Sequence, residues 1–397
     1  MSVAINADQA TDRNLSLALL LNAAHALDHL VLLIFAAAVG AIAADFGFAR
    51  WEDLMPYTAG AFFAFGLGSL PAGRLGDTWG RRSMMLVFFF GIGAALLLVA
   101  MTQTAAQMAV ALTLVGVFAA IYHPVGIPML VQGSTRPGRT IGINGLAGNL
   151  GIALAALLTG LLVKYAGWRA AFVAPALLAL VLGFLFARAA PLESAPPSRR
   201  APSKGELPPG IIARAFAVIT ISATSASLIF NFTTNGNGEM LRERMQAIIG
   251  DPAALGLLLA IVYTVASFAQ LIVGRLIDRV PLKRLLLVIV AMQIPLFVLA
   301  AYAQGWMFFL AAILFMAFVS GAIPFTDALI VRYVDDRMRS RAAGMRLAIS
   351  FSISSIAVYL LGPLVKSSGF AFLLLAMAVI SAVTLSAAAW LPVVPKR

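Results

Sequence analysis

The chain has 397 residues, of which 61% are hydrophobic and only 11% are charged, and its mean hydropathy is +0.96. Soluble globular domains carry about 25% charged and about 45–50% apolar residues, so a water-soluble fold has no place for this much apolar surface. The composition therefore predicts a membrane protein. Cysteine is absent, which excludes disulfides, thiolate nucleophiles and cysteine metal sites.

The net charge of +12 indicates nucleic-acid binding only when the basic residues gather on one soluble face, and here they are distributed between apolar runs. Residues 1–16 are polar and include Asp8 and Asp12, and the first apolar run is too long for a signal peptide. We therefore expect this run to remain as a membrane span.

Runs of about 20 apolar residues, bounded by charged residues, proline or glycine, predict an all-α membrane protein with twelve transmembrane helices. The expected organisation is an N-terminal six-helix bundle at 1–189, a cytoplasmic linker at 190–210 that is rich in proline, serine and charge, and a C-terminal six-helix bundle at 211–397. The expected spans are 17–44, 55–76, 83–102, 106–131, 140–163, 169–188, 211–234, 253–275, 284–303, 306–331, 343–365 and 369–392.

The distribution of lysine and arginine predicts the orientation of these spans. With both termini in the cytoplasm, all but six of the 28 basic residues fall on the cytoplasmic side, as the positive-inside rule requires. We therefore expect a multi-pass protein of the cell inner membrane, in contact with the lipid bilayer and without a nucleic-acid partner. The six exceptions are Arg50, Lys164, Arg169, Arg242, Arg244 and Lys366.

Two loops resemble each other across about half the length of the chain. Residues 73–77 (Gly-Arg-Leu-Gly-Asp) follow the second expected span, and residues 274–278 (Gly-Arg-Leu-Ile-Asp) follow the eighth, at an offset of 201 positions. A basic cluster follows each copy. Repeated halves are typical of transporters that rock around a central site, so the repeat bears on function.

These features together resemble the major facilitator superfamily over essentially the whole chain. The resemblance rests on the twelve spans, the central linker, the Gly-x-Leu-x-Asp-x-x-Gly-Arg-Arg loop at 73–82, and Gly-Trp-Arg at 167–169. It implies two pseudo-symmetric six-helix bundles (the major facilitator fold), no cofactor, a monomer, and a central cavity lined by spans 1, 4, 7 and 10.

Within the superfamily, the N-terminal half resembles the fosmidomycin-resistance type of efflux transporter. His25 in the first span, Tyr-His-Pro at 122–124 and Gly-Asn-Leu-Gly at 148–151 carry this resemblance. That branch tends to have an Asn-Asp pair where this chain has Asp28 and His29, so the substrate need not be shared.

The first span carries the strongest candidate for proton coupling. His25, Asp28 and His29 are spaced i, i+3 and i+4, so they stack on one helical face. An ionisable residue inside a membrane helix is a functional candidate by default, and histidine titrates near neutral pH. His123, at a similar depth in the fourth span, completes the set. We hypothesise that these four residues load and release the coupling proton.

Two other interpretations of this cluster remain. Interhelical hydrogen bonds can simply hold membrane helices together, contributing about 0.6 kcal/mol each. His25, His29 and His123 are also acceptable ligands for a transition metal. A membrane metalloprotease is disfavoured, because no glutamate follows the first histidine of the His-x-x-x-His pair.

Further residues are assigned to the cavity or to a conformational gate. The stretch 108–125 has no arginine, although drug-proton antiporters of the superfamily commonly place one there, so proton coupling falls on Asp28 and the histidines. The additional cavity candidates are Tyr122, Asn149, Asp327 and Arg346. The gate candidates, which the resemblance associates with latching the two halves, are Gly73, Asp77, Arg81, Arg82 and Asp278.

Two local patterns predict features of helix geometry and packing. Residues 231–239 (NFTTNGNGE) are poor helix formers and predict a broken seventh span that forms part of an outer gate, or a plain extracellular loop. Span 5 has glycine at every third position from 142 to 151, a bare strip that permits close helix approach. The resemblance implies packing of this strip against span 8.

The sequence thus predicts a secondary active transporter that exports a small organic molecule in exchange for protons by alternating access. The alternatives are uptake of an organic anion or a divalent metal ion through the same cavity, with Arg346 as the nearest cation for an anion. A membrane-embedded enzyme is the alternative from a different class. No nucleotide-binding motif is present, which disfavours transport driven by ATP.

Overall fold

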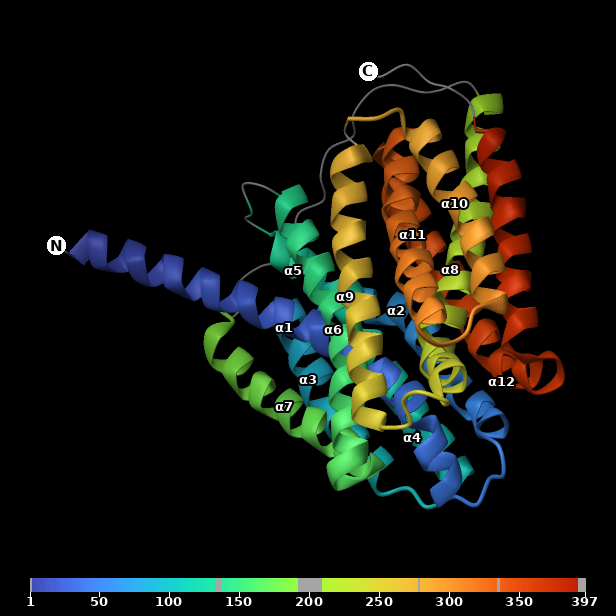
Figure 1. Cartoon of the computed structure of the whole chain (residues 1–397). Coiled ribbons are helices and arrows are strands. Elements are labelled where there is room, and N and C mark those ends of the chain that lie inside the picture. Colours follow the sequence, from blue (N-terminus) through green and yellow to red (C-terminus); the bar gives the residue numbers. More distant parts are fainter. Residues whose placement is uncertain are drawn as a thin grey trace.

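The computed structural model describes residues 2–132, 134, 137–191, 209–277, 279–333 and 336–391, and these residues are helical apart from short connections (Figure 1). In chain order the helices are α1 (Ser2–Asp45), η1 (Trp51–Asp53), η2 (Met55–Thr58), α2 (Ala59–Trp79), α3 (Arg81–Ala100), α4 (Ala105–Ala119), η3 (Tyr122–Gly126), α5 (Ile127–Val131), α6 (Pro137–Ala166), α7 (Trp168–Ala189), α8 (Pro209–Met245), α9 (Pro252–Ile277), α10 (Leu282–Tyr302), α11 (Gly305–Tyr333) and α12 (Asp336–Ala389).

The described helices account for the twelve expected spans. Ten helices are long and apolar enough to cross a membrane. The last of these, Ser352–Ala389, contains Gly369 at φ 74°, where α12 turns back on itself and so forms two spans. The remaining span is α2, whose glycines, Arg74 and Asp77 lower its hydropathy. The fourth span consists of α4, η3 and α5 in succession.

Because successive spans alternate in direction, their connections fall at two ends of the molecule. We call the end that carries the turns at Gly80 and Ala190 the linker end. The end that carries the turns at Gly167 and Gly369 is the distal end. At the distal end Gly167 and Gly369 both have positive φ, 81° and 74°, a conformation that favours glycine.

The fourth span changes helix type at its prolines. Pro124 lacks the N–H that an α-helix needs, and residues Tyr122–Gly126 form a turn of π-helix between α4 and α5. A proline inside a helix typically causes such an irregularity, and the turn places Tyr122 and His123 on the side of the span that faces α1.

The prediction of a broken seventh span is wrong. Residues 231–239 lie inside the continuous helix α8. Their polar side chains return hydrogen bonds to the preceding turn: Asn235 Nδ2 donates to the carbonyl of Asn231 (3.1 Å), and Thr234 Oγ1 donates to that of Phe230 (2.7 Å). These bonds and burial against neighbouring helices compensate for the low helix propensity of the segment.

The two halves of the chain meet closely at the distal end. On α6, a Cβ added to Gly160 would lie 2.6 Å from the carbonyl oxygen of Pro252, and one added to Gly256 on α9 would lie 2.6 Å from that of Ala156. The helix backbones therefore touch here without intervening side chains. Lys164 also pairs with Asp251 across the same contact.

The glycine strip of span 5 packs differently from the prediction. At the linker end, a Cβ added to Gly142 or Gly145 would meet nothing within 4 Å. Further along, a Cβ on Gly151 would lie 2.1 Å from the carbonyl oxygen of Ala26, so this part of the strip packs on α1 rather than on α9. Span 5 therefore lies against span 1 where the strip is buried, and the side of the strip at Gly142 and Gly145 faces open space.

One hydrogen bond, from a basic side chain to a backbone carbonyl, occurs in both halves, at positions separated by the same 201 residues as the two repeated loops. Arg82 Nε donates to the carbonyl oxygen of Ala190 (3.1 Å), and Lys283 Nζ donates to that of Leu391 (2.9 Å). Both pairs of positions differ by 201. In each half a cation after the second span therefore caps the C-terminal end of the sixth.

The glycine contacts predict opposite effects of one substitution at two positions. Gly160→Ala would force apart the α6 and α9 backbones and should destabilise the protein by about 1–3 kcal/mol. Gly142→Ala enters open space and should stabilise α6 by about 0.5–1 kcal/mol, because alanine loses less backbone entropy. Thermal unfolding of both variants in detergent measures the difference, and equal shifts would contradict the close approach at Gly160.

Candidate functional site

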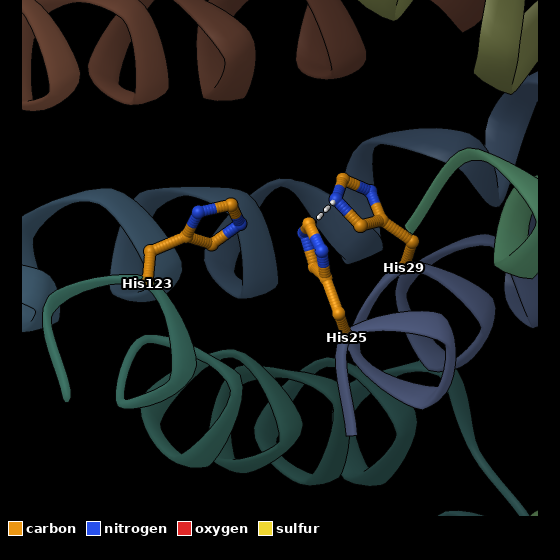
Figure 2. Close-up of side chains that lie close together, drawn as sticks. All are labelled: His25, His29 and His123. Carbon is orange, nitrogen blue, oxygen red and sulfur yellow. Dashed lines mark hydrogen bonds between the residues drawn. The ribbon is translucent and has the colours of Figure 1, made fainter. Parts of the chain in front are cut away.

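Three histidine rings from two separate spans lie together in the N-terminal half. His25 and His29 come from α1 and His123 from η3, and Figure 2 shows the rings converging in the space between these elements. The ring centroid of His25 lies 4.9 Å from that of His29 and 5.1 Å from that of His123. The predicted grouping of the three histidines is therefore present in the structure.

The hydrogen bonds of His25 define which nitrogens carry protons in the neutral pair. His25 Nδ1 lies 2.7 Å from the carbonyl oxygen of Asn144 on α6. Because a carbonyl only accepts, Nδ1 must be the protonated nitrogen, and Nε2 is then an acceptor. His29 Nε2, at 3.2 Å from His25 Nε2, is therefore the donor of the bond drawn in Figure 2.

Asp28 is fully buried beside His123. Its exposed fraction is 0%, and neither carboxyl oxygen has a hydrogen-bond partner in the described part of the chain. Asp28 Oδ2 lies 3.6 Å from His123 Nε2. A buried carboxylate needs either a proton or a neighbouring cation. One proton therefore makes the pair neutral overall, whether it resides on the carboxyl or on the imidazole.

Tyr122 supports His25 instead of lining a cavity, which corrects its predicted role. The side chain has 0% exposure and its ring stacks on that of His25 at 4.8 Å. Its hydroxyl donates to the carbonyl of Leu21 (2.8 Å) and accepts from Asn144 Nδ2 (2.7 Å). Sequence reasoning missed Asn144, whose only signal is an amide within an apolar span.

Asn149 does not reach the histidine cluster. Its amide donates to the side-chain oxygen of Gln270 on α9, so it connects the two halves of the chain. The preceding residue, Gly148, contacts the cluster: a Cβ there would lie 2.7 Å from His25 Cε1 and 2.9 Å from His29 Cδ2. Neighbouring residues of α6 therefore contact the imidazoles on one side and α9 on the other.

For Asp327 and Arg346, the remaining cavity candidates, the structure describes no contact with the histidine cluster. Asp327 belongs to α11 and Arg346 to α12, and the side chains of both lie outside the described part of the structure. Asp278 also lies outside the described residues.

A pocket lies between the two halves, one helical turn beyond His29. Its walls on α1 and α6 are apolar, and its walls on α8 and α9 carry the polar side chains, a division that sequence reasoning missed. Its lining residues include Leu33, Ala36, Ile152, Thr234, Asn235 and Tyr263. The polar wall is the surface of α8 that its Asn- and Thr-rich sequence provides.

The gate candidates of the first loop have identifiable contacts at the linker end. Arg82 caps α7, with Nη2 donating to the carbonyl of Ala187 (2.7 Å), and Arg81 Nη1 donates to Gln132 Oε1 (3.1 Å). A Cβ on Gly73 would lie 3.3 Å from Pro124. Asp77 is exposed and makes no ion pair with a described residue.

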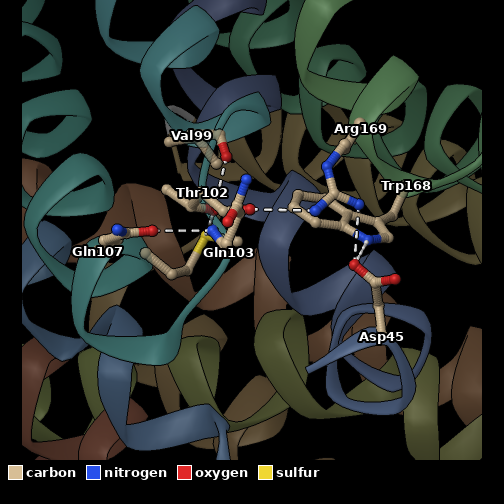
Figure 3. Close-up of polar contacts among 8 residues, drawn as sticks. Asp45, Val99, Thr102, Gln103, Gln107, Trp168 and Arg169 are labelled. Atoms are coloured by element: carbon tan, nitrogen blue, oxygen red, sulfur yellow. Dashed lines mark hydrogen bonds and ion pairs between the residues drawn. The ribbon is translucent and has the colours of Figure 1, made fainter. Parts of the chain in front are cut away.

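The Gly-Trp-Arg motif forms a separate polar network at the distal end (Figure 3). Asp45 Oδ2 accepts from Trp168 Nε1 (3.1 Å) and from Arg169 Nη1 (2.8 Å), and Arg169 Nη2 donates to the carbonyl of Thr102 (3.1 Å). The network connects α1, the turn after α3 and the start of α7. It holds the N-terminal half together and is far along α1 from His25.

The three histidines do not close around a single metal ion in this state. Their donor nitrogens are separated by up to 4.8 Å. Two nitrogens bound to one zinc ion at about 2.0–2.1 Å can be no more than about 4.2 Å apart. The arrangement fits proton sharing between hydrogen-bonded imidazoles better than metal coordination.

The fold is helical and multi-span, and it buries a cluster of titratable groups inside its N-terminal half. The chain matches the family model described as Major Facilitator Superfamily over residues 21–241 and 215–397. It therefore belongs to the major facilitator superfamily. This is a family of secondary transporters and not of enzymes, which excludes the membrane-embedded enzyme.

Two curated relatives are resistance proteins of Streptomyces. The chain is 32% identical over 156 residues to the tetracenomycin C resistance and export protein of Streptomyces glaucescens, covering 38% of this chain and 29% of the relative. It is 35% identical over 109 residues to a puromycin resistance protein of Streptomyces alboniger, covering 27% and 22%. The chain therefore aligns with less than a third of the length of either relative.

Solved structures share the fold over nearly the whole chain. A bacterial homologue of the human lysosomal transporter Spinster, inward-facing and occupied, has a TM-score of 0.73 at 14% identity and covers 94% of this chain and 95% of its own. The nucleoside transporter NupG has a TM-score of 0.71 at 15% identity, with 94% and 99% covered. These similarities show the all-helical major facilitator fold.

The hydroxyl of Tyr122 predicts a measurable contribution to stability. Tyr122→Phe leaves the carbonyl of Leu21 and the amide of Asn144 without their partner in a buried site, and it should destabilise the protein by about 1–3 kcal/mol. Tyr302→Phe, at a residue that is 72% exposed, is the control and should change stability by less than about 0.5 kcal/mol. Thermal unfolding compares the two, and an unaffected Tyr122→Phe would contradict the network.

The distal ion pair predicts no pH response in the neutral range. Lys164, which donates a hydrogen bond to Asp251, holds the pKa of that carboxyl below its ordinary value of 3.8. A lowered pKa contributes stability that is present above the ordinary pKa and lost as pH falls through the lowered one. We therefore expect Asp251→Asn to leave the pH profile of transport unchanged between roughly pH 5 and 8. A shifted profile would contradict this assignment.

Proposed function

We propose that this protein exports a small organic molecule from the cell in exchange for protons, by alternating access. It works as a monomer in the inner membrane with both termini in the cytoplasm. The bodies that rock are the bundles at 1–189 and 211–397, joined by the linker at 190–210. The observation that carries the proposal is the buried pair of Asp28 and His123, which holds one proton between two sites.

In this proposal the proton is exchanged between His123, whose side chain is partly exposed, and Asp28, which is fully buried. The His123 side chain is 18% exposed, whereas that of Asp28 is 0% exposed. Once the imidazole of His123 is protonated, its buried Nε2–H passes its proton to Asp28 Oδ2 as the N–H bond breaks and the O–H bond forms, when the two atoms approach from 3.6 Å. The move neutralises a buried carboxylate without leaving a buried cation, so both end states are tolerated.

The cavity between the halves is small in this state, and the chemistry of its lining favours an organic substrate of mixed polarity once the halves move apart. An apolar part of the substrate faces α1 and α6, and a hydrogen-bonding part faces Thr234, Asn235 and Tyr263. The described lining contains no charged residue, which favours such a molecule over the organic anion of the alternative proposal. The names of the Streptomyces relatives support a drug-like substrate, and the fosmidomycin-resistance type remains a prediction from three short motifs.

We take the linker end as the open end of this state. A Cβ added to Gly142 or Gly145 on α6, or to Gly274 on α9, would meet nothing within 4 Å, while α6 and α9 touch at the distal end. With the termini in the cytoplasm, this state receives substrate from the cytoplasm, as export requires. The loop with Asp77, Arg81 and Arg82 would latch this end in the opposite state.

The proposal is tested with purified protein in vesicles. Puromycin, tetracenomycin C, fosmidomycin and Zn²⁺ are first screened as ligands by thermal shift at two pH values. Transport of a ligand found in this way is then driven by an imposed pH gradient. We expect Asp28→Asn and His123→Ala to lose proton-driven transport by about tenfold or more.

The control is Asp251→Asn, which removes a carboxylate outside the cluster and should retain proton-driven transport. Full activity in both Asp28→Asn and His123→Ala would contradict the proposal. A thermal shift with Zn²⁺ that disappears in His25→Ala would replace it with metal transport.

A further inference from the structure

Two residues of α6, Asn144 and Gly148, pack tightly against the His25–His29 pair. The carbonyl of Asn144 accepts the Nδ1–H of His25 at 2.7 Å. One turn later Gly148 lies against both imidazoles, because even a methyl group there would be 2.7–2.9 Å from ring atoms of His25 and His29. The two rings are therefore held directly against the backbone of α6.

The residue after Gly148 connects the same turn to the C-terminal half. Asn149 lies about 100° around the helix from Gly148 and donates its amide to the side-chain oxygen of Gln270 on α9. Beyond this point towards the linker end, a Cβ added to Gly142 or Gly145 on α6, or to Gly274 on α9, would meet nothing within 4 Å. The Asn149–Gln270 bond thus lies at the border between the packed and the separated parts of these helices.

A further proton on the imidazole pair goes to His29 Nδ1. His25 Nδ1 donates to Asn144 and His25 Nε2 accepts from His29 Nε2 at 3.2 Å, so His29 Nδ1 is the nitrogen of the neutral pair that still accepts a proton. The added positive charge then lies on a ring that is in contact with Gly148.

The titratable groups around the pair are few in the described part of the chain. Tyr122 and His123 on η3 face the pair, and Asp28 on α1 faces His123. The described contacts from α6 are Asn144 and Gly148, neither of which titrates. A change in the charge of His25 and His29 therefore reaches α6 through these two residues.

We propose that Gln270 is a positioning residue for the histidine pair. By anchoring Asn149, it holds the α6 turn at residues 144–149 against His25 and His29, so that protonation of the pair alters the contact between α6 and α9. This inference rests on the proposed proton coupling and adds to it a route from the proton site to the interface between the halves. In this inference Gln270 on α9 acts only through Asn149, without itself binding the proton or the substrate.

The absence of cysteine from the chain makes a single-cysteine reporter unambiguous. Gly142→Cys places a thiol at an exposed position with open space around it, and closing of the linker end would cover it. The rate of maleimide labelling in membrane vesicles then reports how open this end is. It is measured across roughly pH 5 to 8, the range in which histidine titrates.

We expect the labelling rate of the reporter protein to change with pH, and Gln270→Leu to reduce that change by about fivefold or more. The exchange of the two side chains, Asn149→Gln with Gln270→Asn, rebuilds the same bond and should restore the profile. Gln293→Leu is the matched control. Gln293 is a buried glutamine on α10 that bonds to Phe318 and Ser381 within its own half, so its loss should leave the pH profile unchanged.

The outcomes separate this inference from the proposed function. A pH-dependent rate that persists in Gln270→Leu would overturn the role of Gln270 and leave proton coupling intact. A rate that is independent of pH in the reporter protein would overturn both. If Gln270→Leu fails to fold, as size-exclusion chromatography reveals, Gln270→Asn alone replaces it. Its shorter side chain should also flatten the profile, and an unchanged profile would overturn the inference.

Discussion

The buried carboxylate of Asp28 is the constraint on which the rest of the site depends. A charge with no exposure inside a membrane helix is unstable unless a proton or a cation compensates it. His123 provides the only described ion-pair contact, at 3.6 Å. The π-turn at Tyr122–Gly126 brings His123 to that position. The local irregularity caused by Pro124 therefore serves a chemical purpose, because a regular helix would present a different face to α1.

The histidine pair extends this constraint into α6. His25 is held on three sides, by the Asn144 carbonyl, by the Tyr122 ring and by His29. Because α6 is also the helix that meets α9 across the molecule, the histidine cluster and the contact between the halves share one structural element.

The polar residues of α8 show how burial overrides local propensity. By propensity, the Asn- and Thr-rich segment 231–239 should break a helix. In the structure its side chains bond back to carbonyls of the preceding turn, and the helix continues to Met245. The polarity that indicated a loop is instead the polar wall of the pocket between the halves.

The sequence by itself determined the membrane class, the twelve spans, the family and the grouping of His25, Asp28, His29 and His123, because hydropathy, motif spacing and helical periodicity are local properties. The tertiary structure decided that Asn144 hydrogen-bonds to His25, that Asn149 reaches Gln270 on α9, that the Tyr122 ring stacks on His25, and that the buried part of the glycine strip of span 5 faces span 1. These outcomes depend on which faces of distant helices meet. Helix packing is set by the shapes of both partners, and no single stretch of sequence contains that information.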